Sequence, residues 1–172
     1  MTLVSKLVST SRLLLRPVQP EDLDAFAPMY ADPEVMRYVG VRTTSTREET
    51  AAWLDRTIAR NELEGWDMRT VVLREPETVI GRCGIAIHLV EKEPEHEVAY
   101  MLSRAHWGLG YATEAATAMR DHALGTLGLH RLIALIDHGN EASKGVAGKL
   151  GMAFERNVWF HGREVELFAL EA

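Results

Sequence analysis

Two glycines, Gly108 and Gly110, stand in a short turn directly before a segment with helical periodicity that begins near Ala112. Glycine has no Cβ atom, so a ligand can approach the backbone closely at both positions. The first N–H groups of a helix lack partners within the helix, and the helix dipole favours an anion at that end. The pattern predicts a phosphate-binding turn, although a bare Gly-x-Gly is more often an ordinary helix entry.

A dinucleotide-binding fingerprint of the form Gly-x-Gly-x-x-Gly is excluded at this turn. The third glycine would have to occupy position 113, which is Thr113. The turn also follows a hairpin meander instead of a first parallel strand. We therefore reject a Rossmann-type site.

Glu97 is the first candidate for a general base, because a carboxylate held beside a proton donor can take its proton. It belongs to an expected strand over residues 95–103, where alternation places Glu95, Glu97 and Ala99 on one face. The alternative is a solvated carboxylate at an edge position of an acidic segment. Both interpretations stay open, and His96 is the weaker candidate.

Asn140 and Ser143 follow the expected strand 131–136 and suit the N-terminus of a short helix, which both residue types cap well. Cys83 lies among alternating apolar residues and is expected in the core. His122, on the apolar side of a helix, is expected to serve packing. The remaining histidines show no metal-ligand spacing, so no metal site is predicted.

Hydrophobic periodicity and turn residues give the order β-α-α-β-β-β-α-β-α-β-β. Val35 to Gly40 is expected to begin a loop. The expected elements are strands at 11–17, 69–74, 79–90, 95–103, 131–136, 153–160 and 164–170, and helices from Pro20, at 46–64, 112–127 and 142–150. The unit 95–136 predicts one right-handed βαβ crossover in an otherwise antiparallel sheet. The fold class is thus mixed α/β, with helices on both faces of the sheet, in a single domain over residues 1–172.

The composition limits the classes of partner. The 172 residues carry a formal net charge of −6, which argues against an electrostatic grip on DNA or RNA. No apolar run is long enough to cross a membrane, and the first residues lack the layout of a signal peptide. A cytoplasmic location is the expectation. The single cysteine excludes an intramolecular disulfide.

Several segments, taken in order, resemble the GNAT superfamily of N-acetyltransferases, in the branch that contains the ribosomal-protein N-terminal acetyltransferases. They span nearly the whole chain and comprise Ser11–Pro17, Asp32–Tyr38, Tyr100–Leu102, Trp107–Ala115, Asn140–Ser143 and Lys149–Met152. In the family's phosphate motif an Arg or Gln is usual where Trp107 stands, although this branch commonly has Trp. The phosphate contacts implied are to the backbone.

The resemblance implies that acetyl-CoA is the co-substrate and that strands 95–103 and 131–136 splay apart around its pantetheine arm. The residues implied to hold it are Ala99, Tyr100, Met101, Leu102, Trp107, Gly108, Leu109, Gly110, Tyr111, Ala112, Thr113, Asn140 and Ser143. Ala147 stands where many relatives carry a tyrosine acid, so either Ser143 protonates the departing sulfur, which we favour, or no side chain is needed. Glu114 is expected to point away from the phosphate.

The implied reaction is direct attack of a primary amine on the thioester through a tetrahedral intermediate, with Glu97 as the base. The amine is a protein or peptide N-terminus; the alternatives are a small amine such as an antibiotic or polyamine, or a non-catalytic acyl-CoA-binding module. The protein is expected to be a monomer or homodimer.

Overall fold

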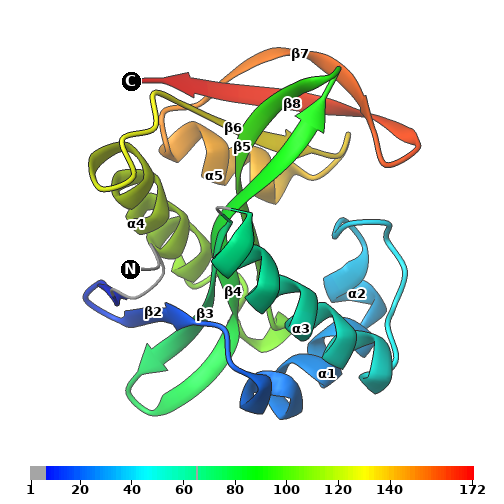
Figure 1. The fold of residues 1–172 in the computed structure, drawn as a ribbon, viewed down its shortest axis with the longest axis vertical. Coiled ribbons are helices and arrows are strands. Elements are labelled where there is room, and N and C mark those ends of the chain that lie inside the picture. The colour runs from blue at the N-terminus through cyan, green and yellow to red at the C-terminus, as the bar shows by residue number, and fades with distance from the viewer. Residues whose placement is uncertain (1–6, 65) are drawn as a thin grey trace.

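The computed structural model describes residues 7–64 and 66–172 and is drawn in Figure 1. Its strands are β1 (Val8–Ser9), β2 (Leu13–Pro17), β3 (Asp67–Arg74), β4 (Glu77–Val90), β5 (Glu93–Leu102), β6 (Arg131–Ile136), β7 (Ala153–Phe160) and β8 (Arg163–Glu171). Its α-helices are α1 (Leu23–Ala31), α2 (Pro33–Met36), α3 (Arg47–Leu63), α4 (Tyr111–Gly125) and α5 (Glu141–Lys149). Among the described residues, no helix is long and apolar enough to cross a membrane.

The strands form one sheet in the order β1-β2-β3-β4-β5-β6-β8-β7. All neighbours are antiparallel except β5 and β6, which are parallel and joined through α4. This confirms the mixed α/β fold class and the single crossover. In Figure 1, β6, β7 and β8 run across the top of the molecule, while β2 and β3 lie in its lower half.

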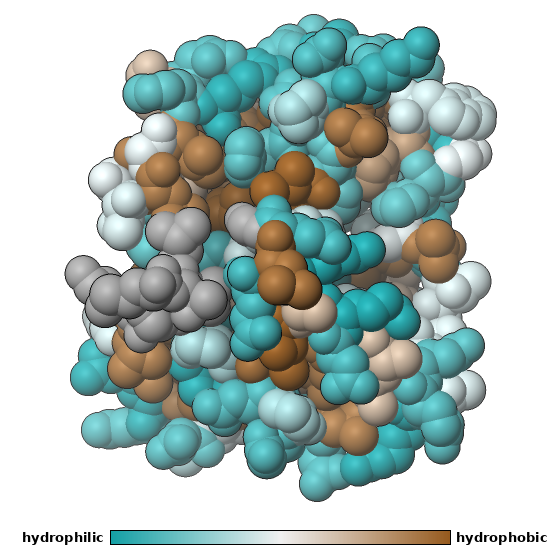
Figure 2. Space-filling view, viewed as in Figure 1, coloured by the Kyte–Doolittle hydropathy of each residue, from teal (hydrophilic) through white to brown (hydrophobic). Residues whose placement is uncertain are grey.

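Helices cover both faces of the sheet, as alternation along β4 and β5 predicts. Ile85 and Val98 share a buried cluster with Met119 of α4. On the other face, Met101 shares a second cluster with Phe26 of α1. The sequence places Ala112, Ala115, Ala116, Met119 and Ala123 on one face of α4, and all but Ala112 are fully buried. Figure 2 shows that hydrophobic residues on the viewed face gather near its middle, between hydrophilic upper and lower parts.

The expected loop over 35–40 is wrong at its start, where Pro33–Met36 form the short helix α2. Asp32 accepts a hydrogen bond from the backbone N–H of Glu34 at 2.9 Å, and Pro33 fills the first helical position. An Asp-Pro pair ends one helix but is equally suited to begin another. The new helix buries Val35 and Met36.

The inward face of α3 also differs from the expected one. Helical spacing predicts Ala51, Leu54 and Ile58 on the inward face. Leu54 is buried, but the other buried positions are Thr50, Thr57 and Asn61. The Thr50 hydroxyl donates to the carbonyl of Thr46 at 2.8 Å, which satisfies its polar atom in the interior. A periodicity search counts threonine as polar even where it is buried. The inward face predicted from the sequence therefore differs from the observed one.

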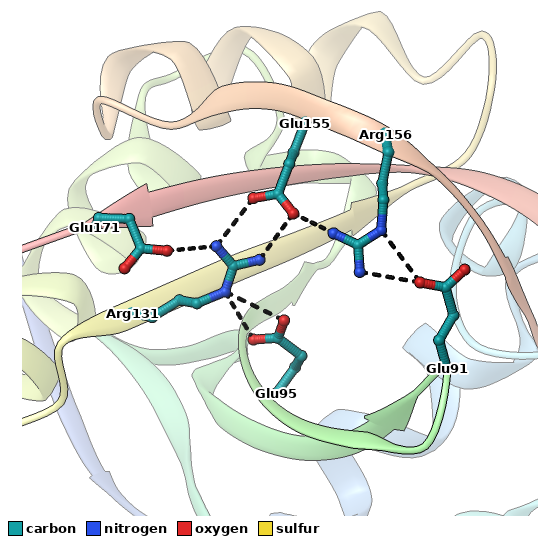
Figure 3. Close-up of polar contacts among 6 residues, drawn as sticks. All are labelled: Glu91, Glu95, Arg131, Glu155, Arg156 and Glu171. Carbon is teal, nitrogen blue, oxygen red and sulfur yellow. Dashed lines mark hydrogen bonds and ion pairs between the residues drawn. The ribbon is translucent and has the colours of Figure 1, made fainter.

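An ion-pair network joins the tip of the β4–β5 hairpin to β6, β7 and β8 (Figure 3). Arg131 lies within 3.1 Å of carboxylate oxygens of Glu95, Glu155 and Glu171. Arg156 contacts Glu155 and Glu91, the latter in the hairpin turn. The carboxylates of Glu155 and Glu95 raise the pKa of Arg131 further above its ordinary value. The network therefore fixes the hairpin against the second half of the sheet.

Replacing Arg131 with glutamine is expected to lower the free energy of unfolding by about 1–2 kcal/mol, because three carboxylates lose a shared cation. Arg156→Gln, which removes a more exposed arginine (41% against 27% of the side chain), should cost less than about 1 kcal/mol. Urea unfolding at low and high salt measures both. An effect of Arg131→Gln equal to that of Arg156→Gln, or one insensitive to salt, would contradict the stabilising role of Arg131 in the network.

Candidate functional site

The site begins where β5 and β6 part. β5 pairs with β4 at ten successive positions, but with β6 only at Glu97 and Ile133. Two residues further along β6, the backbone N–H of Leu135 donates to Glu97 Oε1 at 3.3 Å. A side-chain carboxylate thus replaces the missing strand acceptor. The predicted splay of the two strands is present, and the carboxylate of Glu97 lies in it.

Two cavities meet at this opening. One, of about 480 Å³, lies between α2, the end of β5, the glycine turn and the start of α5. The other, of about 580 Å³, lies on the side of α3 and the β7–β8 turn. We call them the coenzyme cavity and the amine cavity, after the ligands that we propose for them. They share the lining residues Tyr38, Val39, Tyr100, Asn140, Ser143 and Val146.

The glycine turn forms one end of the coenzyme cavity. Gly108 and Gly110 have φ angles of +72° and +81°, a region that residues with a Cβ rarely adopt. Gly110 is the N-cap of α4 and leaves the first helical N–H groups without a side-chain cap. By contrast, Thr46 caps α3 and Asn140 caps α5. The first turn of α4 therefore has donors available for an anion.

Most of the predicted coenzyme contacts line this cavity, but two, Ala99 and Leu109, do not. The lining includes Tyr100, Met101, Leu102, Trp107, Gly108, Gly110, Tyr111, Ala112, Thr113, Asn140 and Ser143. Ala99 lines the amine cavity. Leu109 points outward, with 53% of its surface exposed, and contributes no lining atom. Trp107 lines the cavity, yet its indole N–H donates to the carbonyl of Leu102 at 2.9 Å and so closes the turn.

Arg12 braces the glycine turn from outside, a role that the sequence did not reveal. Its Nη1 donates to the carbonyl of Leu109 at 2.9 Å, and its Nε to Glu114 at 2.6 Å. Its guanidinium also lies 4.3 Å from the centre of the Tyr111 ring. Glu114 accordingly points away from the coenzyme cavity, as expected, and ties α4 to the residues before β2.

Ser143 sits where the cavities join and accepts two hydrogen bonds on Oγ. The hydroxyl of Tyr100 and the Nδ2 of Asn140 both lie 3.0 Å away, while Asn140 Oδ1 accepts the N–H of Ser143. A hydroxyl has two acceptor positions and one donor. With both acceptor positions used, the Ser143 proton is free to be donated into the cavity. Burial is the main cause that raises the pKa of Tyr100 to about 12, so its phenol stays protonated.

Glu97 lines the amine cavity and is not a solvated edge carboxylate. Its side chain is 14% exposed, and Oε2 lies 2.9 Å from His88 Nε2 on β4. β5 is an interior strand, so the alternative that places Glu97 at an edge position is wrong. The alternation argument itself holds, since Val98, between Glu97 and Ala99, packs in the buried cluster with Met119 of α4.

Aromatic rings surround His88 on the wall of the amine cavity. The ring centres of Trp66 and Phe160 lie 5.6 and 5.0 Å from that of His88. His161, in the β7–β8 turn, is 6.4 Å away. Burial, with the nearby His88 and Arg163, lowers the pKa of His161 and favours its neutral form. The sequence did not place these two histidines together, because the β3–β4–β5 meander and the last hairpin meet only in the folded chain.

Cys83 and His122 lie away from the two cavities. Cys83 is fully buried and burial raises the pKa of its thiol to about 12, so it is a core residue as expected. His122 does more than pack: its Nε2 lies 2.9 Å from Oδ2 of the buried Asp67. In the described parts of the chain, no group of three or more His, Cys, Asp or Glu could hold a metal ion.

Comparison with known proteins agrees with this geometry. Residues 12–153 match the family model of the acetyltransferase (GNAT) domain. The chain is 34% identical to an uncharacterized N-acetyltransferase, p20, of Bacillus licheniformis, over 78% of this chain and 75% of that one. A GNAT-family acetyltransferase structure from Bacillus anthracis superposes with a TM-score of 0.82 at 24% identity, covering 96% and 98% of the two chains. RimL, a ribosomal L7/L12 α-N-protein acetyltransferase solved with CoA, gives 0.80 at 17% identity, covering 96% and 98%.

Proposed function

The chain belongs to the GNAT acetyltransferases, and on this premise we propose that it acetylates the α-amine of a protein or peptide. It is an acetyl-CoA-dependent N-acetyltransferase by family, and enzymes of this family act on amines. The observation that carries the proposal is the junction of the two cavities at Tyr100, Asn140 and Ser143. An acetyl group presented from one cavity would meet an amine in the other.

The residues of the coenzyme cavity fit a CoA-shaped ligand. The uncapped first turn of α4, from Gly110 to Thr113, would donate N–H groups to the pyrophosphate. The backbone of Ala99, Tyr100 and Met101 lies at the splay, where β5 loses its β6 partner and can pair with the pantetheine amides. The N–H of Leu102 would face the thioester oxygen, and Asn140 would bind the arm.

Two side chains would move protons. Glu97 would take a proton from the incoming amine, directly or through water, with His88 holding its other oxygen. Ser143 would donate its hydroxyl hydrogen to the sulfur as it leaves, because both its acceptor positions are filled by Tyr100 and Asn140. Tyr100 thus supports Ser143 from the strand, in place of the tyrosine that is absent at Ala147.

Exposed hydrophobic side chains at the amine cavity favour a polypeptide over a small, fully enclosed amine. Leu89 lines the cavity with 72% of its surface exposed. Val41 and Leu63 are 65% and 82% exposed and directly follow or precede the lining residues Gly40 and Glu64. Exposed apolar side chains near a cleft are suited to contacting a partner chain.

The test is release of free thiol from acetyl-CoA in the presence of peptides and small amines, including polyamines and aminoglycosides. We expect turnover with peptide N-termini and loss of turnover when the α-amine is blocked. Turnover confined to small amines would replace the peptide with a small-molecule substrate. CoA binding without thiol release from any amine would indicate a non-catalytic module.

Ser143→Ala is expected to lower kcat about tenfold or more and to leave the affinity for CoA within about twofold. The effect is moderate because a thiolate of pKa near 8.5 leaves without full protonation. Tyr100→Phe should show a smaller loss in the same direction. Ser45→Ala, in the α2–α3 loop and outside both cavities, is the control. Unchanged kcat in Ser143→Ala would remove this residue from the mechanism.

A further inference from the structure

Three arginines line the amine cavity, and two of them face a carboxylate. Arg163 donates from Nε and Nη2 to the carboxylate of Asp137, at 2.6 and 3.0 Å. Arg60 has Glu64 at 3.6 Å and lies over the Trp66 ring. Each of these two arginines therefore has a carboxylate partner within the protein, and Asp137 is shared between Arg163 and Arg42.

Arg82, the third, has only neutral partners in the described part of the chain. Its Nε donates to the Tyr30 hydroxyl at 2.8 Å, and its Nη1 lies 3.6 Å from the Met68 sulfur. The guanidinium also lies 5.2 Å from the centre of the Trp53 ring. A guanidinium has five N–H donors, and these contacts use two of them. The half-buried cation therefore retains donors and an uncompensated charge.

The position of Arg82 places this charge beside the predicted acyl site. On β4 it pairs with Met101 of β5, a residue that lines the coenzyme cavity, while Arg82 lines the amine cavity. Arg82 and Ala86 lie on the same face of β4, and Ala86 pairs with Glu97. This face of the sheet thus carries the cation of Arg82 and, four residues further along β4, the position opposite the proposed base Glu97.

We propose that Arg82 binds a carboxylate of the substrate, so that the substrate is a primary amine that also carries a carboxylate. This deepens the proposed function and rests on it. The planar guanidinium suits a carboxylate bound through two hydrogen bonds. A single unpaired charge matches one carboxylate better than a phosphate dianion. A polyamine would instead bring a second cation towards Arg82, which disfavours that class.

The substrate carboxylate has two possible sources, an acidic residue near a peptide N-terminus or a free carboxyl terminus. Three matched pairs separate them: glutamic acid α-amide with glutamine α-amide, Ala-Glu-amide with Ala-Gln-amide, and Ala-Gly with Ala-Gly-amide. The two members of each pair differ in one carboxylate. Calorimetric titration of the full chain saturated with CoA measures binding of each without requiring turnover.

We expect the carboxylate member of at least one pair to bind about tenfold or more tightly than its amide, as a charge-assisted hydrogen-bond pair provides. Arg82→Gln should reduce that ratio to about twofold or less and keep the affinity for CoA. Arg60→Gln, the matched control in the same cavity, should preserve the ratio. If Arg82→Gln fails to bind CoA, the ratios of carboxylate to amide affinity in the unaltered protein and in Arg82→Lys decide whether Arg82 binds the carboxylate.

No carboxylate preference in any pair, or a preference that survives in Arg82→Gln, overturns this inference. Thiol release from the same amines is measured separately. Acetylation without a carboxylate preference would overturn the role of Arg82 alone. A carboxylate preference without thiol release from any amine would count against the proposed acetyl transfer and leave the binding site in place.

Discussion

Glu97→Gln is expected to lower kcat/KM for the amine by about 10²- to 10⁴-fold, the usual contribution of a general base. Glutamine has the same shape and can still accept the Leu135 N–H, so the splay of β5 and β6 should persist. It cannot take a proton from the amine. The affinity for CoA should stay within about twofold, because Glu97 lines the amine cavity and not the coenzyme cavity.

Glu95→Gln is the matched control for this change. Glu95 lies two residues earlier on the same face of β5, but its carboxylate is engaged by Arg131 at 3.0 Å. Its loss should leave kcat/KM within about threefold. Steady-state kinetics with one acetylated peptide measures both variants. If Glu97→Gln retains full turnover, another group or bulk water is the base, even though the chain remains an acetyltransferase.

Asp67→Asn is expected to lower the free energy of unfolding by about 3–5 kcal/mol, the cost of breaking a buried ion pair on one side. Asp67 and Arg69 have 1% and 0% of their side chains exposed. Asp67 contacts Arg69 Nε at 2.8 Å and His122 Nε2 at 2.9 Å. The asparagine would remove the buried negative charge that Arg69 and His122 contact.

Asp24→Asn provides the comparison, because Asp24 pairs with Arg47 at the surface with 85% of its side chain exposed. That loss should cost less than about 1 kcal/mol. Urea unfolding followed by circular dichroism gives both values. An Asp67→Asn loss below about 1 kcal/mol would mean that the buried network contributes little to the fold.

The sequence predicted the strand order around the site because its signals are local. Alternation in β4 and β5, the turn between β3 and β4, and Gly110 before α4 each depend on a few neighbouring residues. The order of these elements then fixed the single parallel pair. Failures occurred where a local signal had two meanings, as at Asp32-Pro33, or where a polar side chain was buried, as at Thr50.

The site was predictable in its strand and turn, but not in its long-range partners. Glu97 was named as a candidate from its strand and Ser143 from the family resemblance, and the roles of both stay predictions. His88, Arg82 and Arg12 were not identified as site residues, since their roles depend on contacts with residues far away in the sequence, such as Tyr30 and Glu114. His122 was assigned to packing because Asp67, 55 positions earlier, is invisible to helical periodicity.

The central claim is that CoA binds with its pyrophosphate at the N-terminus of α4 and its arm along β5. The most direct measurement is the change in backbone amide resonances of the ¹⁵N-labelled protein as CoA is added. We expect the largest shifts at Gly108, at residues 110–113 and at residues 100–102. Saturation with CoA that leaves these amides unmoved, or that shifts a different surface most, would contradict the account.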